Sequence, residues 1–121
     1  MKVLVIDDEE DIRLIAQLGL QASGLDVVVA AGGSDGVALA CAHQPDIIVL
    51  DWMMPGLDGP ATLAALRKDV ATARIPVVIL SAKNLTFAGD DLRGLGVVDV
   101  IGKPFAPREL VRRITAALGL R

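Results

Sequence analysis

Four places in the sequence carry side chains that could do chemistry together. Each place follows a short apolar run, and the side chains are Asp7, Asp8 and Glu9 after residues 3–6, Asp51 after 47–50, Ser81 after 77–80 and Lys103 after 98–101. An Asp that follows a strand is more often a turn or capping residue, so no single one is decisive. Together, however, the carboxylates of Asp7, Asp8 and Asp51 in one pocket would repel one another unless a cation lay among them.

The donor atoms of that pocket indicate which cation it would bind. All of its ligands would be oxygens, with no His or Cys nearby, and such a set predicts Mg²⁺. Lys103 would add a positive charge, and Ser81 a hydroxyl donor, on the other side of the same pocket. The sequence therefore predicts a magnesium site with a lysine and a serine beside it.

Short apolar runs supply the strands that would bring these side chains together. They are residues 3–6, 27–30, 47–50, 77–80 and 98–101. The first four are apolar throughout, which indicates strands buried on both faces of a parallel sheet covered by helices. Ligand sites in such sheets form outside the carboxyl ends of the strands, where the candidate residues lie.

Amphipathic segments between the runs predict five helices. Their ranges are 12–24, 34–41, 63–69, 84–95 and 107–119. Ser34 is the predicted N-cap of the second. The fourth contains Gly89 and Gly94, each costing about 1 kcal/mol relative to Ala, so we expect it to be short, frayed or mobile. Strict alternation of strand and helix predicts a doubly wound α/β fold with right-handed crossovers.

Four motifs in order, VLVIDDEE, IIVLDWMMPGLDG, PVVILSA and IGKPF, closely resemble the receiver domain of two-component response regulators. The resemblance covers essentially the entire chain. It implies a flavodoxin-like five-stranded parallel sheet in the order 2-1-3-4-5 with five helices. Because 121 residues suffice for one domain and no linker is evident, we expect residues 1–121 to be a single receiver domain without an output domain.

The resemblance also implies a role for each candidate residue. Asp51 would be the phosphoacceptor, modified by a sensor histidine kinase, a histidine phosphotransfer protein or a small phosphodonor. Three groups would bind the metal with Asp51, namely Asp8 directly, Asp7 partly through water and the backbone carbonyl of Met53. Ser81 would hydrogen-bond a phosphoryl oxygen, and Lys103 would pair with the phosphoryl group beside a cis Lys103–Pro104 bond.

The sequence departs from the receiver pattern three positions before the lysine. Receivers usually carry Tyr or Phe there, but this chain has Val100 and contains no Tyr. Valine is stiff at χ1 and has no ring to swing, so the usual aromatic switch is not expected. Met53 and Lys83, each two residues beyond a site residue, would border the phosphoryl group, and we predict that they set its lifetime.

Composition limits the remaining functions. The net charge is −3 and no run of basic residues reaches five, which argues against binding nucleic acid or an anionic membrane by electrostatics alone. Arg108, Arg112 and Arg113 have helical spacing and are interpreted as a solvated face. Cys41 lies in an Ala-rich stretch and is predicted to be a reduced core residue. No apolar run is long enough to cross a bilayer, so a soluble, cytoplasmic protein is expected.

Two other classes of function remain open from the sequence. One is a receiver-like module that binds a downstream protein without being phosphorylated. The other is a phosphohydrolase with an aspartyl-phosphate intermediate, but its proton-donating acid would stand at Met53. The leading prediction is a signalling module, not an enzyme beyond its own phosphorylation and dephosphorylation, that docks a partner or relays phosphate.

Overall fold

A parallel five-stranded sheet forms the centre of the protein. The computed structural model describes residues 1–82 and 89–120. The strands are β1 (Lys2–Ile6), β2 (Asp26–Ala30), β3 (Ile47–Asp51), β4 (Val77–Ser81) and β5 (Val97–Gly102). Their order is β2-β1-β3-β4-β5 and every pairing is parallel, which confirms the predicted topology.

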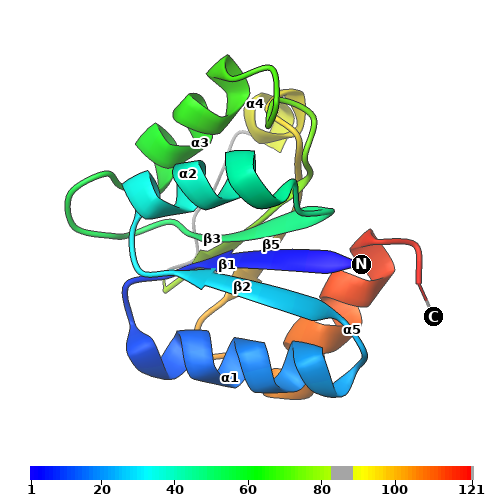
Figure 1. Cartoon of the computed structure of the whole chain (residues 1–121). Coiled ribbons are helices and arrows are strands. Elements are labelled where there is room, and N and C mark those ends of the chain that lie inside the picture. Colours follow the sequence, from blue (N-terminus) through cyan, green and yellow to red (C-terminus); the bar gives the residue numbers. More distant parts are fainter. Residues whose placement is uncertain (83–88, 121) are drawn as a thin grey trace.

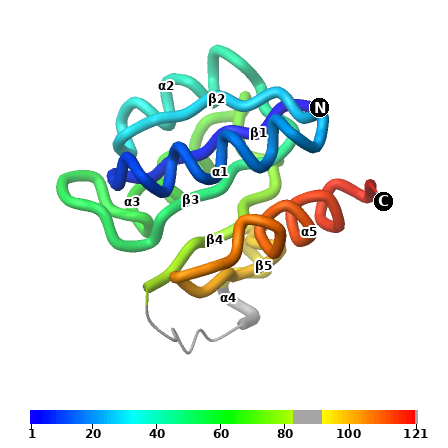
Figure 2. Tube along the Cα trace, turned by 90° about the horizontal axis from the view of Figure 1, so that it is seen from below, coloured from blue at the N-terminus to red at the C-terminus, as the bar shows by residue number. Residues whose placement is uncertain are grey.

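Helices cover both faces of the sheet (Figure 1). The five are α1 (Glu10–Ala22), α2 (Gly33–His43), α3 (Gly59–Lys68), α4 (Gly89–Gly94) and α5 (Pro107–Ala117). Helices α1 and α5 lie on one face, and α2, α3 and α4 lie on the other. Figure 2, seen from below, shows α1 and α5 in front of the sheet with the N- and C-termini at the same end. None of the described helices has the length and apolar character needed to cross a membrane.

The hydrophobic core is divided by the sheet into two layers. One lies under α2 and α3 and includes Ile6, Leu50 and Leu63, and the other lies under α1 and α5 and includes Val5 and Ile114. Because side chains alternate along a strand, each central strand contributes to both layers. Every residue of β3 and β4 is buried, as expected for strands covered on both faces.

Strand β2 differs from the prediction of burial on both faces. Asp26 is exposed, and the three valines that follow are only partly buried. The physical reason is its position, because β2 pairs with β1 alone and forms one edge of the sheet. An apolar run shows that a strand packs against something, but it does not show whether the strand is central.

Helix α2 begins two residues earlier than the predicted N-cap implies. Gly32 is the N-cap and no side chain caps the helix, so the assignment of this role to Ser34 is wrong. A Cβ atom at Gly33 would lie only 2.2 Å from Thr62 Oγ1. Glycine at this position lets α2 approach the start of α3, and this packing decides where α2 begins.

Two further predictions concern Cys41 and the fourth helix. Cys41 is half-buried rather than in the core, and its Sγ donates to Asp69 Oδ2 at 3.3 Å. This contact raises the pKa of the Cys41 thiol through the hydrogen bond to Asp69, with burial adding to it. Of the predicted helix 84–95, Gly89–Gly94 is helical, and residues 84–88 lie outside the described residues, as does Lys83.

Candidate functional site

The candidate residues meet at the carboxyl ends of the strands. Asp7 directly follows β1, Asp51 ends β3, Ser81 ends β4 and Lys103 directly follows β5. Asp7, Asp51 and Ser81 are buried. The sheet order places β1 and β3 side by side, so the acids that leave these strands are neighbours in space. The predicted convergence is therefore observed.

Four acidic side chains surround one small volume at this edge. Asp7, Asp8, Glu9 and Asp51 each offer a carboxylate oxygen, and these four oxygens all lie within 4.8 Å of one another. Asp7 and Asp51 form the buried floor, while Asp8 and Glu9 are exposed at the mouth. Such a set of like charges is unfavourable unless protons or cations compensate it.

Lys103 supplies part of that compensation. Its Nζ lies 2.7 Å from Asp7 Oδ2, 3.2 Å from Glu9 Oε1 and 3.4 Å from Asp51 Oδ1. Burial alone would lower the pKa of Lys103, but the hydrogen bond to Asp7 and the charges of Asp7 and Asp51 outweigh it and raise this pKa above its ordinary value. The ammonium therefore stays charged inside the acidic cluster.

Asp51 is the most perturbed acid of the cluster. Burial, the charge of Asp7 and a hydrogen bond with Asp8 together raise the pKa of Asp51 to about 7, against the opposing effects of Lys103 and the Met53 N–H. The Met53 N–H donates to Asp51 Oδ1 at 3.3 Å, whereas Asp51 Oδ2 is buried and accepts no hydrogen bond from the residues that the structure describes. A buried carboxylate oxygen without a donor is costly, which leaves this atom available to a cation or to a reaction partner.

The donor set fits a hard divalent cation. Carboxylate oxygens are the ligands that such ions prefer, and the buried Asp51 Oδ2 has no other partner among the described residues. One lysine offsets only part of the charge of four acids. A divalent ion would remove the remaining repulsion and would satisfy the Asp51 oxygen.

The loop between β1 and α1 is held by Asp7. Its backbone N–H donates to the Ala30 carbonyl at 3.1 Å, its Oδ1 accepts from the Glu9 N–H at 2.8 Å, and its carbonyl accepts from Arg13 Nη1 at 2.9 Å. These contacts fix the chain where it leaves β1 and turn Asp8 and Glu9 toward the pocket mouth. The position of the acids is therefore set by backbone contacts as well as by the sheet.

The wall of the pocket opposite the acids is formed where the ends of β4 and β5 meet. The Lys103 N–H donates to the Ser81 carbonyl at 2.7 Å, and the peptide bond between Lys103 and Pro104 is cis, as predicted. Ser81 is buried, with 1% of its surface exposed. Serine and lysine thus lie on adjacent strand ends, where the sequence predicts them.

The loop after Asp51 is shaped by packing at its far end. Asp58 caps α3, its Oδ1 accepting from the Ala61 N–H at 2.9 Å. Gly59 lies against the chain at Trp52, since a Cβ at residue 59 would be 2.6 Å from Trp52 Cα. Trp52 is partly buried and packs against the core layer under α2 and α3. Met53, two residues after Asp51, is 55% exposed.

Glu9 is the residue of the cluster to which no role was assigned from the sequence. Its contact with Lys103 joins residues 94 positions apart and is invisible to any local pattern. One signal was present, because Glu9 precedes α1 at the N-cap, where Asp, Asn, Ser and Thr are preferred.

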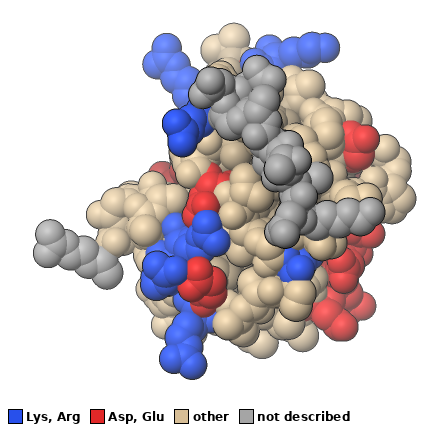
Figure 3. All heavy atoms as spheres, turned by 180° about the vertical axis from the view of Figure 1, so that it is seen from behind, with Lys and Arg blue, Asp and Glu red and all other residues tan. Residues whose placement is uncertain are grey.

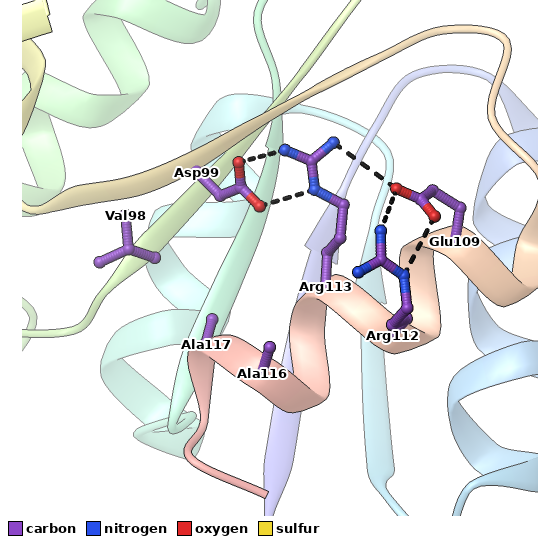
Figure 4. Close-up of a pocket in the computed structure, with 7 residues that line it drawn as sticks. All are labelled: Val98, Asp99, Glu109, Arg112, Arg113, Ala116 and Ala117. Atoms are coloured by element: carbon purple, nitrogen blue, oxygen red, sulfur yellow. Dashed lines mark hydrogen bonds and ion pairs between the residues drawn. The ribbon is translucent and has the colours of Figure 1, made fainter. Parts of the chain in front are cut away.

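A second charged surface lies between β5 and α5, on the face shown in Figure 3, where basic and acidic side chains are intermixed. In Figure 4, Arg113 reaches Asp99 on β5 while Arg112 pairs with Glu109. Arg113 Nε donates to Asp99 Oδ2 at 2.8 Å, and the side chain is only 30% exposed. The interpretation of this basic cluster as a solvated face is therefore wrong for Arg113, which ties α5 to the sheet.

Comparisons with known proteins agree with this geometry. Residues 3–115 match the family model described as the response regulator receiver domain. The chain is 41% identical over 119 residues to the alkaline phosphatase synthesis transcriptional regulatory protein PhoP of Bacillus subtilis, covering 97% of this chain and 48% of that protein. It is 37% identical over 118 residues to the phosphate regulon transcriptional regulatory protein PhoB of Pseudomonas aeruginosa, covering 96% and 51%. The chain thus spans about half the length of these curated relatives.

Solved structures share the same architecture. The receiver domain of the Francisella response regulator 1452 has a TM-score of 0.85 and 36% identity, with 98% of this chain and 96% of that chain covered. The chemotaxis protein CheY4 of Vibrio cholerae has a TM-score of 0.87 and 28% identity, with 95% and 96% covered. Both likenesses extend over nearly the whole of each chain.

Proposed function

The chain belongs to the response regulator receiver domain family, and from this premise we propose that it accepts a phosphoryl group on Asp51. The observation that carries the proposal is the environment of this carboxylate. Asp51 is buried at a strand end, faces three other acids, and has one oxygen without a hydrogen-bond donor and the other 3.4 Å from the Lys103 ammonium.

The transfer would make one bond and break one bond. A carboxylate oxygen of Asp51 attacks phosphorus, and a new phosphorus–oxygen bond forms. The bond from phosphorus to the imidazole nitrogen of a phosphohistidine, or to the acetate oxygen of acetyl phosphate, breaks, and its electron pair leaves with the donor. The product is an acyl phosphate on Asp51. Because the attacking group must be ionised, the raised pKa of Asp51, about 7, has to be brought down in the working site.

Mg²⁺ is the cation that we propose for this purpose. Asp8 and Asp51 would bind it directly, Asp7 partly through water, and the Met53 carbonyl would complete the protein ligands. When bound, the ion would neutralise the acids and the developing charge on the phosphoryl oxygens. The fit rests on the all-oxygen donor set and on the buried Asp51 oxygen.

Lys103 and Ser81 would hold the transferred group from the opposite wall. The Lys103 ammonium stays charged, so it would pair with one phosphoryl oxygen, and the Ser81 hydroxyl would donate to another. The donor would be a sensor histidine kinase or a histidine phosphotransfer protein, and the modified domain would act on a downstream protein. Apart from its own phosphorylation and dephosphorylation, we assign the domain no enzymatic activity.

A receiver-like module that works without phosphorylation is not favoured. Its motivation is Val100, which replaces the usual aromatic residue and packs, partly buried, against the core layer under α2 and α3. Phosphorylation would use the acidic cluster and the lysine that contacts Asp7, Glu9 and Asp51, and binding of a partner alone would not. Val100 would affect how phosphorylation alters the rest of the domain, and it is not one of the residues of the acidic cluster.

The test is incubation of the protein with acetyl phosphate and Mg²⁺, followed by intact mass measurement. We expect one added phosphoryl group, absent in Asp51→Asn and retained in the control Asp35→Asn, which alters an exposed acid in the first turn of α2. No adduct on the wild-type protein with acetyl phosphate or with a phosphohistidine donor would overturn the proposal. Steady consumption of donor far above the adduct would indicate a phosphohydrolase instead.

A further inference from the structure

Glu9 occupies the N-cap position of α1, but its side chain does not cap the helix. It is the N-cap residue of α1, and its carbonyl accepts the first helical hydrogen bond from the Arg13 N–H. Its side chain, however, makes no cap hydrogen bond. A short Asp, Asn or Ser side chain would accept from the free N–H groups of the first turn, whereas the longer Glu is a poor cap. The identity of residue 9 therefore needs another explanation.

The Glu9 carboxylate contacts Lys103 on the other side of the pocket. Its Oε1 lies 3.2 Å from Lys103 Nζ, so the start of α1 is joined to the end of β5. The Glu9 side chain is 59% exposed, whereas those of Asp7 and Asp51 are buried. Glu9 thus contacts the lysine from the solvent side, and the two other acids contact it from below.

Three carboxylate oxygens compete for the Lys103 ammonium in this arrangement, all within 3.4 Å of its Nζ. An ammonium group has three protons, and three carboxylates surround it. A phosphoryl oxygen that pairs with Lys103 would weaken or replace at least one of these contacts. Asp7 is buried and is the nearest at 2.7 Å, and Asp51 is the group being modified. Glu9 is exposed and can turn into water, so its release costs least.

We propose that Glu9 is a positioning residue that holds Lys103 in the resting site and releases it when a phosphoryl group arrives on Asp51. The inference rests on the proposed phosphorylation and adds a regulatory contact to it. Two consequences follow. Glu9 delays pairing of Lys103 with the phosphoryl oxygens, and its negative charge repels an anionic donor at the mouth of the pocket. Both slow the modification of Asp51.

Three variants separate the contact from the charge. Glu9→Asp keeps the charge but is one methylene shorter, so it loses its reach to Lys103. Glu9→Gln keeps the length but removes the charge. Glu10→Gln is the matched control, because it removes an equal charge from the next residue, which is exposed and lies outside the acidic cluster. Thermal unfolding of each variant checks that α1 remains intact.

Two measurements are made on each variant. The first is the initial rate of Asp51 phosphorylation by acetyl phosphate at saturating Mg²⁺, where Glu9→Asp and Glu9→Gln are expected to be about 2- to 5-fold faster, the range an exposed ion pair supports. The second is the ¹⁵N resonance of the Lys103 ammonium in the metal-free protein, expected to shift in both variants. Glu10→Gln should match the wild-type protein in both measurements.

The outcomes decide between the alternatives. If Glu9→Asp leaves both the rate and the Lys103 resonance unchanged, Glu9 does not hold the lysine and the inference is overturned. If Glu10→Gln accelerates the reaction as much as Glu9→Gln does, the effect is one of overall charge, and the inference is again overturned. If the wild-type protein is not phosphorylated at all, the proposed function fails, while the Lys103 resonance still decides whether Glu9 holds the lysine.

Discussion

At the scale of single residues, the electrostatics of the site converge on Asp51. It ends β3 beside Asp7, which follows the neighbouring β1, and burial, the charge of Asp7 and a contact with Asp8 raise its pKa to about 7. When folding raises the pKa of a carboxyl group, ionisation of that group costs the folded protein stability, and protonation removes this cost. The acidic cluster is therefore a source of instability in the metal-free protein at neutral pH.

The pH dependence of Asp51→Asn tests this electrostatic account. The folded-state pKa of about 7 exceeds the unfolded value near 4, so the wild-type protein loses stability as pH rises from about 4 to 7, and the full penalty is present above pH 7. Asparagine mimics the neutral acid. We expect Asp51→Asn to stabilise the metal-free protein by about 2–4 kcal/mol at pH 8 and much less at pH 4 in urea unfolding.

The same pH comparison on Asp35→Asn serves as the control, because Asp35 is exposed on α2. An equal gain in stability at both pH values for Asp51→Asn would show that the raised pKa is not the cause.

The convergence of the candidate residues could be predicted from the sequence because acids, serine and lysine each follow an apolar run. Parallel strands bring such positions to one edge whatever the intervening helices contain. The contact between Glu9 and Lys103 could not be predicted, because it joins two side chains 94 residues apart, and no local pattern shows which of several possible partners each one contacts. The roles assigned to Asp8 and Met53 come from the family resemblance and stay predictions.

At the scale of elements, Arg67 connects three segments around the end of α3. Its Nη1 donates to the Thr72 carbonyl at 3.0 Å, its Nη2 to the Ile75 carbonyl at 2.7 Å and its Nε to the Leu95 carbonyl. Burial lowers the pKa of this guanidinium. One side chain thus fixes the loop before β4 and the chain between α4 and β5 to α3.

Arg67→Lys is expected to destabilise the protein by about 1–3 kcal/mol, because an ammonium cannot reach all three carbonyls and leaves some of them unsatisfied. Urea unfolding measures the loss, and faster amide hydrogen exchange at Leu95 and Gly96 should accompany it. Arg74→Lys, at an exposed position, is the matched control. A variant as stable as the wild-type protein would show that the three hydrogen bonds contribute nothing.

Gly59 tests the packing behind the acceptor loop. A Cβ atom at this position would lie 2.6 Å from Trp52 Cα and 2.7 Å from Trp52 O, so the backbone next to Asp51 must shift. We expect Gly59→Ala to destabilise by about 1–3 kcal/mol through overpacking and to change the fluorescence of Trp52. Gly94→Ala, whose Cβ would meet nothing within 4 Å, should be neutral or stabilising.

Elements were predictable where local pattern and tertiary position agree. The runs of β3 and β4 are apolar because both faces are covered, and their predicted limits differ from the observed ones by a single residue. The edge position of β2, the start of α2 and the half-exposed Cys41 depend on neighbours distant in the sequence. The strand order likewise came from the resemblance to receivers, since periodicity carries no information on which strand lies beside which.

At the scale of the whole molecule, cation binding in the acidic pocket would be coupled to folding. An ion that binds only the folded protein stabilises it by an amount that grows with concentration, about 2.7 kcal/mol at 100 times its Kd. We therefore expect Tm to rise with added Mg²⁺ and to fall again on chelation. NaCl of equal ionic strength should not reproduce the effect, because general screening falls on all surface charges.

Asp8→Asn should reduce this Mg²⁺-dependent rise in Tm, whereas Asp11→Asn, on the exposed first turn of α1 outside the cluster, should leave it intact. A rise of equal size in both variants would place the cation elsewhere on the molecule.

The hydrogen bond from the Lys103 N–H to the Ser81 carbonyl connects the end of β5 to the end of β4. Ser81 and Lys103 lie at the paired ends of β4 and β5, so we expect a displacement of one strand end to displace the other. A perturbation confined to the hydroxyl side of the pocket would therefore be felt along β5 and, through Asp99 and Arg113, in α5. Because residue 100 is Val instead of Tyr or Phe, backbone and side-chain contacts of β5 are the connection between the pocket and α5 that needs no aromatic side chain.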